Sequence, residues 1–265
     1  MVRIGIVGCG GQMGRMLIAE VADTKGAELA GGTDIAESLQ GRDLGEMVGL
    51  SRCGSVVGRE PAALFAASDV VIDFTIPKVS VAIAELAAQM GKALVIGTTG
   101  MDPAQSQAIA AAAERAPILW APNMSLGVNL LLGLVEQVAR TLGPDFDIEI
   151  LEMHHRRKID APSGTALGLG QAAARGRAVA LEAAAIRSRD GQTGARPAGA
   201  IGFATLRGGD VVGEHTVFFA GQGERLELTH RATDRRLFAR GAVKAALWLA
   251  GRGPGLYGMK DVLGL

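Results

Sequence analysis

Near its N-terminus the chain reads Ile4-Gly5-Ile6-Val7-Gly8-Cys9-Gly10-Gly11-Gln12-Met13-Gly14, an apolar run that passes directly into glycines. The residues that follow, Arg15 to Ile18, have a helical composition. Glycines at 8, 11 and 14 allow a tight turn, a close approach of the backbone to a pyrophosphate, and close packing of helix on strand. The stretch therefore predicts a strand-turn-helix unit that holds a dinucleotide phosphate on the free N–H groups of a helix N-terminus.

An acidic residue downstream supports this interpretation. Asp34 follows a second short strand-like run, about 20 positions after the glycines, where a carboxylate can accept from the ribose hydroxyls. A carboxylate repels a 2′-phosphate, the next residue is Ile35, and the nearest downstream base is Arg42. We therefore expect NADH and/or NADPH as cofactor, with NADH accepted at least as well as NADPH.

The first half of the chain alternates β-branched runs with Ala-rich helical stretches, which predicts a parallel sheet with crossover helices. The expected helices include residues 79–90, closed by Gly91, and residues 102–113. The expected strands are Ile4–Val7, Leu29–Gly31, Val70–Phe74, Leu94–Ile96 and Ile118–Trp120.

After Asn123 the pattern changes to one helical stretch, Leu126–Leu142, followed mostly by strands. The expected strands are Asp147–Met153, Gly199–Leu206, Val211–Phe219 and Arg225–His230, with Gly-rich turns between some of them. We predict an α/β protein with a Rossmann-type parallel-sheet domain (residues 1–125 and 236–265). A second α+β domain, with a mostly antiparallel or mixed open sheet, spans residues 126–235 and serves substrate binding and oligomerisation.

Composition excludes several classes of function. The formal net charge of the 265 residues is zero, so the chain offers no electrostatic footprint for nucleic acid. No apolar run is long enough to span a membrane. The two cysteines, Cys9 and Cys53, make neither a disulfide framework nor a metal-ligand spacing, and we expect no metal site. The N-terminus resembles a strand rather than a signal peptide, so we expect a cytoplasmic protein.

The densest cluster of chemical groups is His154-His155-Arg156-Arg157-Lys158-Ile159-Asp160-Ala161-Pro162-Ser163-Gly164-Thr165. On an extended strand end the two histidines point to opposite faces, so they are expected to have different roles. The segment from Asp160 predicts a helix start, with Pro162 in the first turn, whose N–H groups could bind a carboxylate. Without further context, a solvated basic turn followed by a helix cap explains these residues equally well.

This segment, extended from Glu149 to Ala166, strongly resembles the signature of dihydrodipicolinate reductases. The resemblance also covers the glycine turn, Phe74-Thr75, Gly97-Thr98-Thr99-Gly100, Ala121 to Ser125, Arg207 to Asp210, and Thr229 to Ala232. It implies reduction of hydroxy-tetrahydrodipicolinate, a small cyclic dicarboxylate, to tetrahydrodipicolinate with loss of water, on the diaminopimelate route to lysine. It further implies a homotetramer built through the second sheet.

The resemblance also assigns residues. His154 resembles the proton donor or acceptor of the reduction, and Lys158 resembles a second proton donor. His155, Gly164 and Thr165 resemble substrate contacts. The residues that resemble the cofactor cradle are Gly8, Cys9, Gly10, Gly11, Gln12, Met13 and Asp34, with Gly97, Thr98, Thr99, Ala121, Pro122, Asn123 and Met124 near the nicotinamide. Family members that tolerate NADPH can carry Arg where this chain has Ile35.

Two alternatives remain open on the sequence. One is another two-domain NAD-dependent oxidoreductase, such as an aspartate or sugar dehydrogenase, although these lack the His-His-x-x-Lys-x-Asp-Ala-Pro-Ser-Gly-Thr string. The other is a non-catalytic NAD sensor, against which the intact His154 and Lys158 argue. The pair Glu214-His215 is expected to be ordinary alternating strand residues rather than part of a site.

Overall fold

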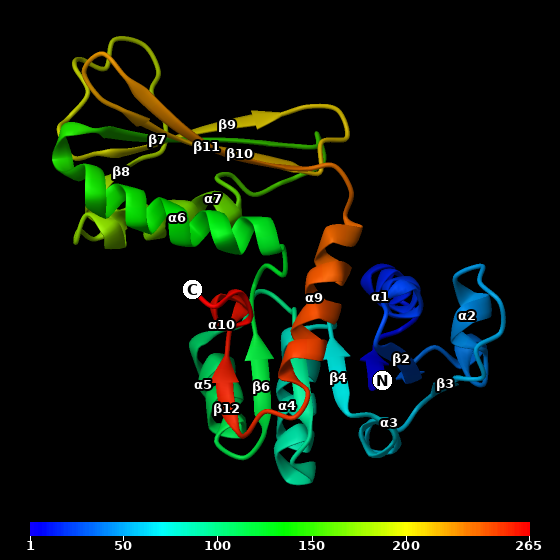
Figure 1. Ribbon diagram of the computed structural model, residues 1–265. Helices are drawn as coiled ribbons and strands as arrows, with labels where there is room; N and C mark the ends of the chain where they lie inside the picture. Colours follow the sequence, from blue (N-terminus) through cyan, green and yellow to red (C-terminus); the bar gives the residue numbers. More distant parts are fainter. The chain divides into compact units, whose positions relative to one another are not determined.

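The computed structural model describes residues 1–265 and divides them into two compact units (Figure 1). The first unit consists of residues 1–125 and 236–264, so the chain leaves it and later returns. The second consists of residues 126–235 together with Leu265.

The first unit contains a seven-stranded sheet whose paired strands are all parallel, in the order β12-β6-β5-β4-β1-β2-β3. The order reverses between β1 and β4, which creates the crevice where doubly wound folds bind their ligands. The strands are β1 (Val2–Val7), β2 (Ala27–Thr33), β3 (Val57–Gly58), β4 (Val70–Asp73), β5 (Ala93–Ile96), β6 (Pro117–Trp120) and β12 (Gly255–Tyr257).

Helices cover both faces of this sheet. The apolar side chains of α3, α4 and α5 form one buried cluster with strand residues, whereas α9 packs on α1 and on β4, β5 and β6. Gly91 ends α4 in the left-handed conformation, as expected from the sequence. Proline occupies the first turn of α3, α4 and α5. The helices are α1 (Gln12–Asp23), α2 (Leu44–Met47), α3 (Pro61–Ala67), α4 (Pro77–Met90), α5 (Pro103–Ala113), α9 (Arg236–Leu249) and α10 (Met259–Leu263), with a 3-10 turn η1 (Glu37–Leu39).

The second unit has a mixed five-stranded sheet in the order β11-β10-β7-β9-β8. β10 is antiparallel to β7 and β11, whereas β9 is parallel to β7 and β8. The strands are β7 (Asp147–His154), β8 (Ala185–Ile186), β9 (Ile201–Arg207), β10 (Gly213–Ala220) and β11 (Arg225–Ala232). The helices are α6 (Leu126–Leu142), α7 (Gly164–Gly176) and α8 (Leu181–Ala184), with a 3-10 turn η2 (Gly143–Asp145).

One face of this second sheet is covered by α6 and α7, which lie on the same side of it (Figure 1). Because side chains alternate along a strand, every second residue of β7 and β10 is buried on that face. On β7 the buried positions are Ile148, Ile150, Glu152 and His154. Two apolar side chains are thus followed by two ionisable ones, which end up on the covered face.

The predicted fold class is confirmed, because a Rossmann-type parallel sheet is joined to a second unit with a mixed sheet. One local prediction is wrong. Pro162 does not lie in the first turn of α7, since that helix begins at Gly164 and is capped by Ser163, whose hydroxyl accepts from the N–H of Ala166. None of the helices is both long and apolar enough to cross a lipid bilayer.

Candidate active site

A groove of about 610 Å³ lies in the first unit at the carboxyl ends of β1, β2 and β4. Its walls include the predicted cofactor residues Gly8, Gly10, Gly11 and Asp34, and residues beyond β4 such as Phe74 and Thr75. The groove therefore occupies the reversal in strand order, where a dinucleotide binds in this architecture.

The glycines of the turn differ in what they permit. Gly8 has a φ of 70°, a conformation that L side chains rarely adopt. At Gly14 a Cβ would lie only 2.6 Å from the Cα of Cys9 and even nearer to the carbonyl of Gly8, so this glycine lets α1 pack on the turn. At Gly11 a Cβ would meet the Gly8 carbonyl at 3.4 Å, an ordinary contact. The turn thus owes its shape to Gly8 and Gly14, while Gly11 leaves space over the groove.

The cradle around the turn is held by backbone hydrogen bonds and by Asp34. The N–H groups of Gly8 and Cys9 donate to the carbonyl of Thr33 at 2.8 and 3.1 Å, and Gly10 N–H donates to Asp34 Oδ2 at 2.9 Å. Gly11 caps α1 without any side-chain hydrogen bond, so no side chain shields the first-turn N–H groups of Gln12 and Met13. These N–H groups are suited to a pyrophosphate.

Cys9 is fully buried, so its side chain does not face the groove. Burial, reinforced by the charge of Asp34, raises the pKa of the Cys9 thiol to about 12. The thiol therefore stays protonated at neutral pH, and only the backbone of Cys9 can contribute to the cradle.

At the ribose end of the groove, Ile35 is 97% exposed and lines the wall beside Asp34. The sequence pointed to Arg42 as the nearest base, but the groove is lined by Arg59, from the loop after β3. Arg59 Nη2 lies 2.7 Å from Glu37 Oε1, so its charge is already paired. Arg59 was missed because the pairing of β2 with β3 carries it to the groove across a loop of unpredictable path.

Beyond β4 and β5, a buried polar cluster organises the predicted nicotinamide end. Asp73 accepts from Thr75 Oγ1 at 2.6 Å and from Ser80 Oγ, which in turn lies 2.8 Å from Thr98 Oγ1. Burial raises the pKa of Asp73, and these hydroxyl donors oppose the increase. Trp120 Nε1 donates to the Thr98 carbonyl at 3.3 Å. The loop after β5 is thereby tied to the ends of β4 and β6.

The other residues predicted near the nicotinamide lie in two loops. Gly97 follows β5 and makes room for the ring of Phe74, and Thr99 comes two residues later. Asn123 accepts from Ser125 N–H at 2.9 Å, and Met124 is buried. Ala121, Pro122, Asn123 and Met124 all lie in the loop after β6. None of these residues lines the groove itself.

The groove fits a dinucleotide. It combines glycines that bring the backbone close, unshielded helix N–H groups, and a carboxylate at the ribose position. Gly8, Gly10, Gly11 and the N–H groups of Gln12 and Met13 would hold the pyrophosphate, and Asp34 the adenosine ribose.

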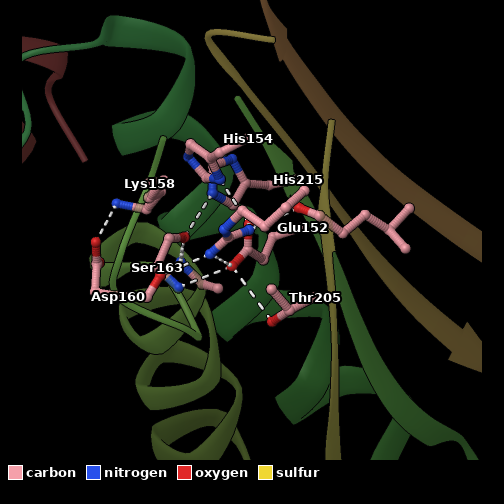
Figure 2. A network of polar contacts seen from close by, with 10 residues as sticks. Glu152, His154, Lys158, Asp160, Ser163, Thr205 and His215 are labelled. Atoms are coloured by element: carbon pink, nitrogen blue, oxygen red, sulfur yellow. Dashed lines mark hydrogen bonds and ion pairs between the residues drawn. The ribbon is translucent and has the colours of Figure 1, made fainter. Parts of the chain in front are cut away.

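The second unit contains a buried polar network centred on Glu152, whose side chain is 1% exposed (Figure 2). Glu152 Oε2 lies 2.6 Å from His154 Nδ1 and 2.8 Å from Arg207 Nη1. Its Oε1 accepts from Arg207 Nη2 at 3.0 Å, from Ser163 N–H at 3.0 Å and from Thr205 Oγ1 at 3.4 Å. Burial alone would raise the pKa of Glu152, but the hydrogen bonds from His154, Arg207 and Ser163 lower it to about 2. Glu152 is therefore ionised at neutral pH.

Strand register explains why these side chains meet. Glu152 and His154 are two residues apart on β7 and so share a face. In the sheet, His215 of β10 lies opposite Glu152, and Arg207 of β9 lies beside His154. The N-terminal end of α7 then supplies Ser163 to the same group.

His215 completes the network. Its Nε2 lies 3.0 Å from Ser163 Oγ, and its ring packs edge-on against that of His154, with centroids 5.1 Å apart. Burial, together with the charge of His154, lowers the pKa of His215 to about 4. His215 is thus neutral at physiological pH. Glu214 and His215 do alternate along β10, as expected, but His215 also joins the polar network, and the register of β10 on β7 is the signal that places it there.

The predicted substrate-end residues lie around this network. Lys158 Nζ donates to Asp160 Oδ1 at 2.8 Å, and this pair appears at the edge of the group in Figure 2. His155 follows the end of β7, and its N–H donates to the Val211 carbonyl at 2.8 Å. Gly164 and Thr165 form the first turn of α7, and the space beside Gly164 is open. The second unit therefore presents a lysine and a helix N-terminus around a buried histidine–carboxylate pair, a combination suited to an anionic substrate that needs a proton.

A dinucleotide groove in one unit and an acid–base network in the other define a two-domain Rossmann-type enzyme. Models of the dihydrodipicolinate reductase N-terminus and C-terminus match residues 2–124 and 127–263. The chain belongs to the dihydrodipicolinate reductase family, and it is an NAD(P)H-dependent oxidoreductase.

Individual relatives agree with the family assignment. The chain is 56% identical to the 4-hydroxy-tetrahydrodipicolinate reductase of Methylocella silvestris over 264 residues, which is 99% of this chain and 97% of the relative. It is also similar to a dipicolinate-bound dihydrodipicolinate reductase from Paenisporosarcina, with a TM-score of 0.78, 26% identity, and coverage of 98% and 99% of the two chains. A myo-inositol dehydrogenase from Corynebacterium glutamicum has a TM-score of 0.58 at 14% identity, covers 99% of this chain and 92% of its own, and shares the fold alone.

Proposed function

We propose that this chain catalyses the reduction of 4-hydroxy-tetrahydrodipicolinate to tetrahydrodipicolinate, with loss of water, in the diaminopimelate route to lysine. The observation that carries the proposal is the His154 to Thr165 segment, which folds into a histidine–carboxylate pair beside a lysine and a helix start. The relatives that match the chain over nearly its full length are named 4-hydroxy-tetrahydrodipicolinate reductase. The dipicolinate in the Paenisporosarcina structure supports a small cyclic dicarboxylate as substrate.

The proposed roles follow from the groups that each residue offers. A bound nicotinamide cofactor supplies the hydride. His154 supplies or accepts the proton at Nε2, because its Nδ1 is engaged by Glu152. Lys158 and the first-turn N–H groups at Gly164 and Thr165 bind a substrate carboxylate, while His155 contacts the substrate. Lys158 acts as a second proton donor once it leaves Asp160, to which its Nζ donates in the structure.

The test of this proposal is the oxidation of NADH or NADPH by the purified chain with freshly made substrate. We expect turnover by the wild type and a fall of kcat of about 100-fold or more for His154→Gln, with a smaller change of KM, since general acid–base catalysis contributes about 10²- to 10⁴-fold. Lys158→Gln should raise the KM for substrate as well as lower kcat. Unchanged turnover by His154→Gln would refute the assigned role, and no turnover by the wild type would refute the proposed reaction.

We further propose that NADH is accepted at least as well as NADPH. The carboxylate of Asp34, the apolar Ile35 and the Arg59–Glu37 pair leave no uncommitted cation at the ribose end of the groove. A 2′-phosphate would therefore meet one anion without compensation from a free base. Paired steady-state kinetics with the two cofactors test this, and a strong preference for NADPH would contradict it.

The assembly that we propose is a homotetramer formed through the open face of the second sheet. The face opposite α6 and α7 carries apolar side chains on three adjacent strands, namely Leu151, Met153, Leu206 and Phe218. Apolar residues gathered on an uncovered face are typical of a surface that pairs with another copy. We also propose that the enzyme acts in the cytoplasm, and cell fractionation tests this location.

A further inference from the structure

The pairing between His154 and Glu152 has chemical consequences beyond the roles assigned above. Glu152 is ionised, and an ionised carboxylate can only accept hydrogen bonds. The atom of His154 that faces it, 2.6 Å away, is Nδ1, so Nδ1 must be the donor. The neutral ring is thereby restricted to the tautomer with the proton on Nδ1 and a lone pair on Nε2. A Cβ on Gly213 would lie 3.0 Å from this Nε2, so the absence of a side chain at 213 leaves Nε2 room.

Glu152 is itself prevented from turning. Arg207 donates to both of its oxygens, at 2.8 and 3.0 Å, in the bidentate geometry that fixes the plane of a carboxylate. Arg207 is oriented in turn by the Asp160 carbonyl, which accepts from its Nη2 at 2.6 Å. Besides Arg207, the Oε1 atom of Glu152 accepts from Ser163 N–H. One carboxylate therefore connects the proton-transferring histidine to the residue that caps α7.

We propose that Glu152, held by Arg207, is a positioning residue for the reduction: it fixes His154 in the Nδ1–H tautomer and in register with the N-terminus of α7. The proposal rests on the proposed function for the role of His154, whereas the tautomer is a property of the folded protein alone. Figure 2 shows the arrangement, with Glu152 lying between His154, Ser163 and Thr205.

The neutral state of His215 agrees with this arrangement. The rings of His154 and His215 are in contact, and a second charge there would oppose protonation of His154 during turnover. His215 also lies within hydrogen-bond distance of Ser163, so it braces the same cap. His215 therefore brings no charge to the ring of His154, and Glu152 is the only anion that this ring contacts by hydrogen bonding.

The decisive variant is Glu152→Gln. Three donors, Arg207 Nη2, Ser163 N–H and Thr205 Oγ1, face the Oε1 position, so the amide oxygen of Gln is favoured there. Its NH₂ group would then face both Nδ1 of His154 and Nη1 of Arg207. It would displace this guanidinium nitrogen and favour the opposite tautomer of His154, with the proton on Nε2. We expect kcat to fall about 10- to 100-fold, the substrate KM to change less than about threefold, and the Kd for NADH to stay the same.

The tautomer is read directly from long-range ¹H–¹⁵N correlation spectra of the imidazoles, which is practical because the chain has four histidines. The His154→Gln spectrum assigns the signal. Wild type should show Nδ1–H, and Glu152→Gln should show Nε2–H. Glu149→Gln is the matched control, since Glu149 lies on the same strand but faces the opposite side of the sheet. Like Glu152 it is ion-paired, in its case with Arg189 and Arg196. It should change neither the tautomer nor kcat.

The outcomes separate this inference from the proposed function. An Nε2–H tautomer in the wild type, or an unchanged tautomer and kcat in Glu152→Gln, overturns the positioning role. If Glu152→Gln does not fold, the spectra of the wild type and of Glu152→Asp decide. Glu152→Asp keeps a carboxylate and should therefore keep the Nδ1–H tautomer of His154. Loss of that tautomer in Glu152→Asp would contradict the proposal. If Glu152→Gln switches the tautomer but the wild type has no reductase activity, the positioning role of Glu152 stands and the proposed reaction is refuted.

Discussion

At the scale of single residues, the polar network makes the second unit sensitive to acid through two groups with different pH windows. The pKa of His215 is about 4 in the folded chain, below its ordinary value of 6.5, because the ring is buried. The unfolded chain therefore binds a proton that the folded chain does not, and stability falls as the pH drops from about 6.5 to about 4. Glu152, with a folded pKa of about 2 against an ordinary 4.5, extends the loss of stability at lower pH.

We predict that His215→Gln flattens the acid side of the stability profile between pH 6.5 and pH 4. The shift of the His215 pKa corresponds to about 3 kcal/mol of pH-dependent stability, which the variant lacks. Urea unfolding at a series of pH values measures this slope. An identical slope for wild type and variant in that window would contradict the assignment of the acid sensitivity to His215.

A second prediction at this scale concerns Ile35, which is exposed and lines the groove beside Asp34. Ile35→Arg adds a guanidinium at the ribose end of the groove, where it can form a charge-assisted hydrogen bond with a 2′-phosphate. We expect the KM for NADPH to fall about tenfold relative to that for NADH. Ile35→Gln is the control for side-chain length without charge and should leave the ratio unchanged, and an equal effect of both variants would exclude a charge effect.

Residues could be predicted from the sequence where the chemistry is local. His154, Lys158 and Asp34 stand out because each belongs to a contiguous pattern of spacing and residue type. Glu152, Arg207 and His215 join the site only through the register of β7 with β9 and β10, which residue order does not contain. A buried acid two positions before a histidine on one strand was nevertheless visible in the sequence, and period-two alternation would have placed both side chains on one face.

At the scale of elements, the turn between β1 and α1 separates glycines needed for folding from glycines needed for binding. We predict that Gly14→Ala lowers stability by more than about 1 kcal/mol, because its methyl group would overlap the Gly8 and Cys9 backbone. Gly11→Ala should keep the melting temperature within about 2 °C, since its φ of −69° suits any residue and its nearest contact is ordinary.

Binding should discriminate the same two variants in a different way. Gly11 lines the groove, so the Gly11→Ala methyl group should weaken NADH binding, measured by quenching or by calorimetry, although the fold is intact. Equal losses of melting temperature in both variants would contradict this division of roles.

The long elements themselves were predictable, because apolar periodicity, prolines in first turns and Gly91 mark them. Short pieces such as β3, α2 and β12 were not, because two to four residues carry too little pattern.

At the scale of the whole molecule, the open face of the second sheet makes a testable prediction about assembly. Leu206→Glu places a charge on that face at a side chain that is 47% exposed, so the monomer should still fold. We expect the mass in solution to fall from that of a tetramer to that of a smaller species. Leu256→Glu, equally exposed at 47% but on β12 of the first unit, is the matched control and should leave the assembly unchanged. A monomeric wild type, or equal effects of both variants, would contradict the proposed interface.

The discontinuity of the first unit also sets an order of events during protein synthesis. Six of its seven strands have been translated by residue 120, but α9, which buries Ala239, Val243, Ala246 and Leu249, and β12 come only after the whole second unit. The apolar surface that α9 covers on β4, β5 and β6 therefore stays uncovered until α9 has been synthesised, after residues 126–235, which form a core of their own. The second unit begins to emerge last but is the first that can finish folding, and the seven-stranded sheet is completed only after β12 has been synthesised.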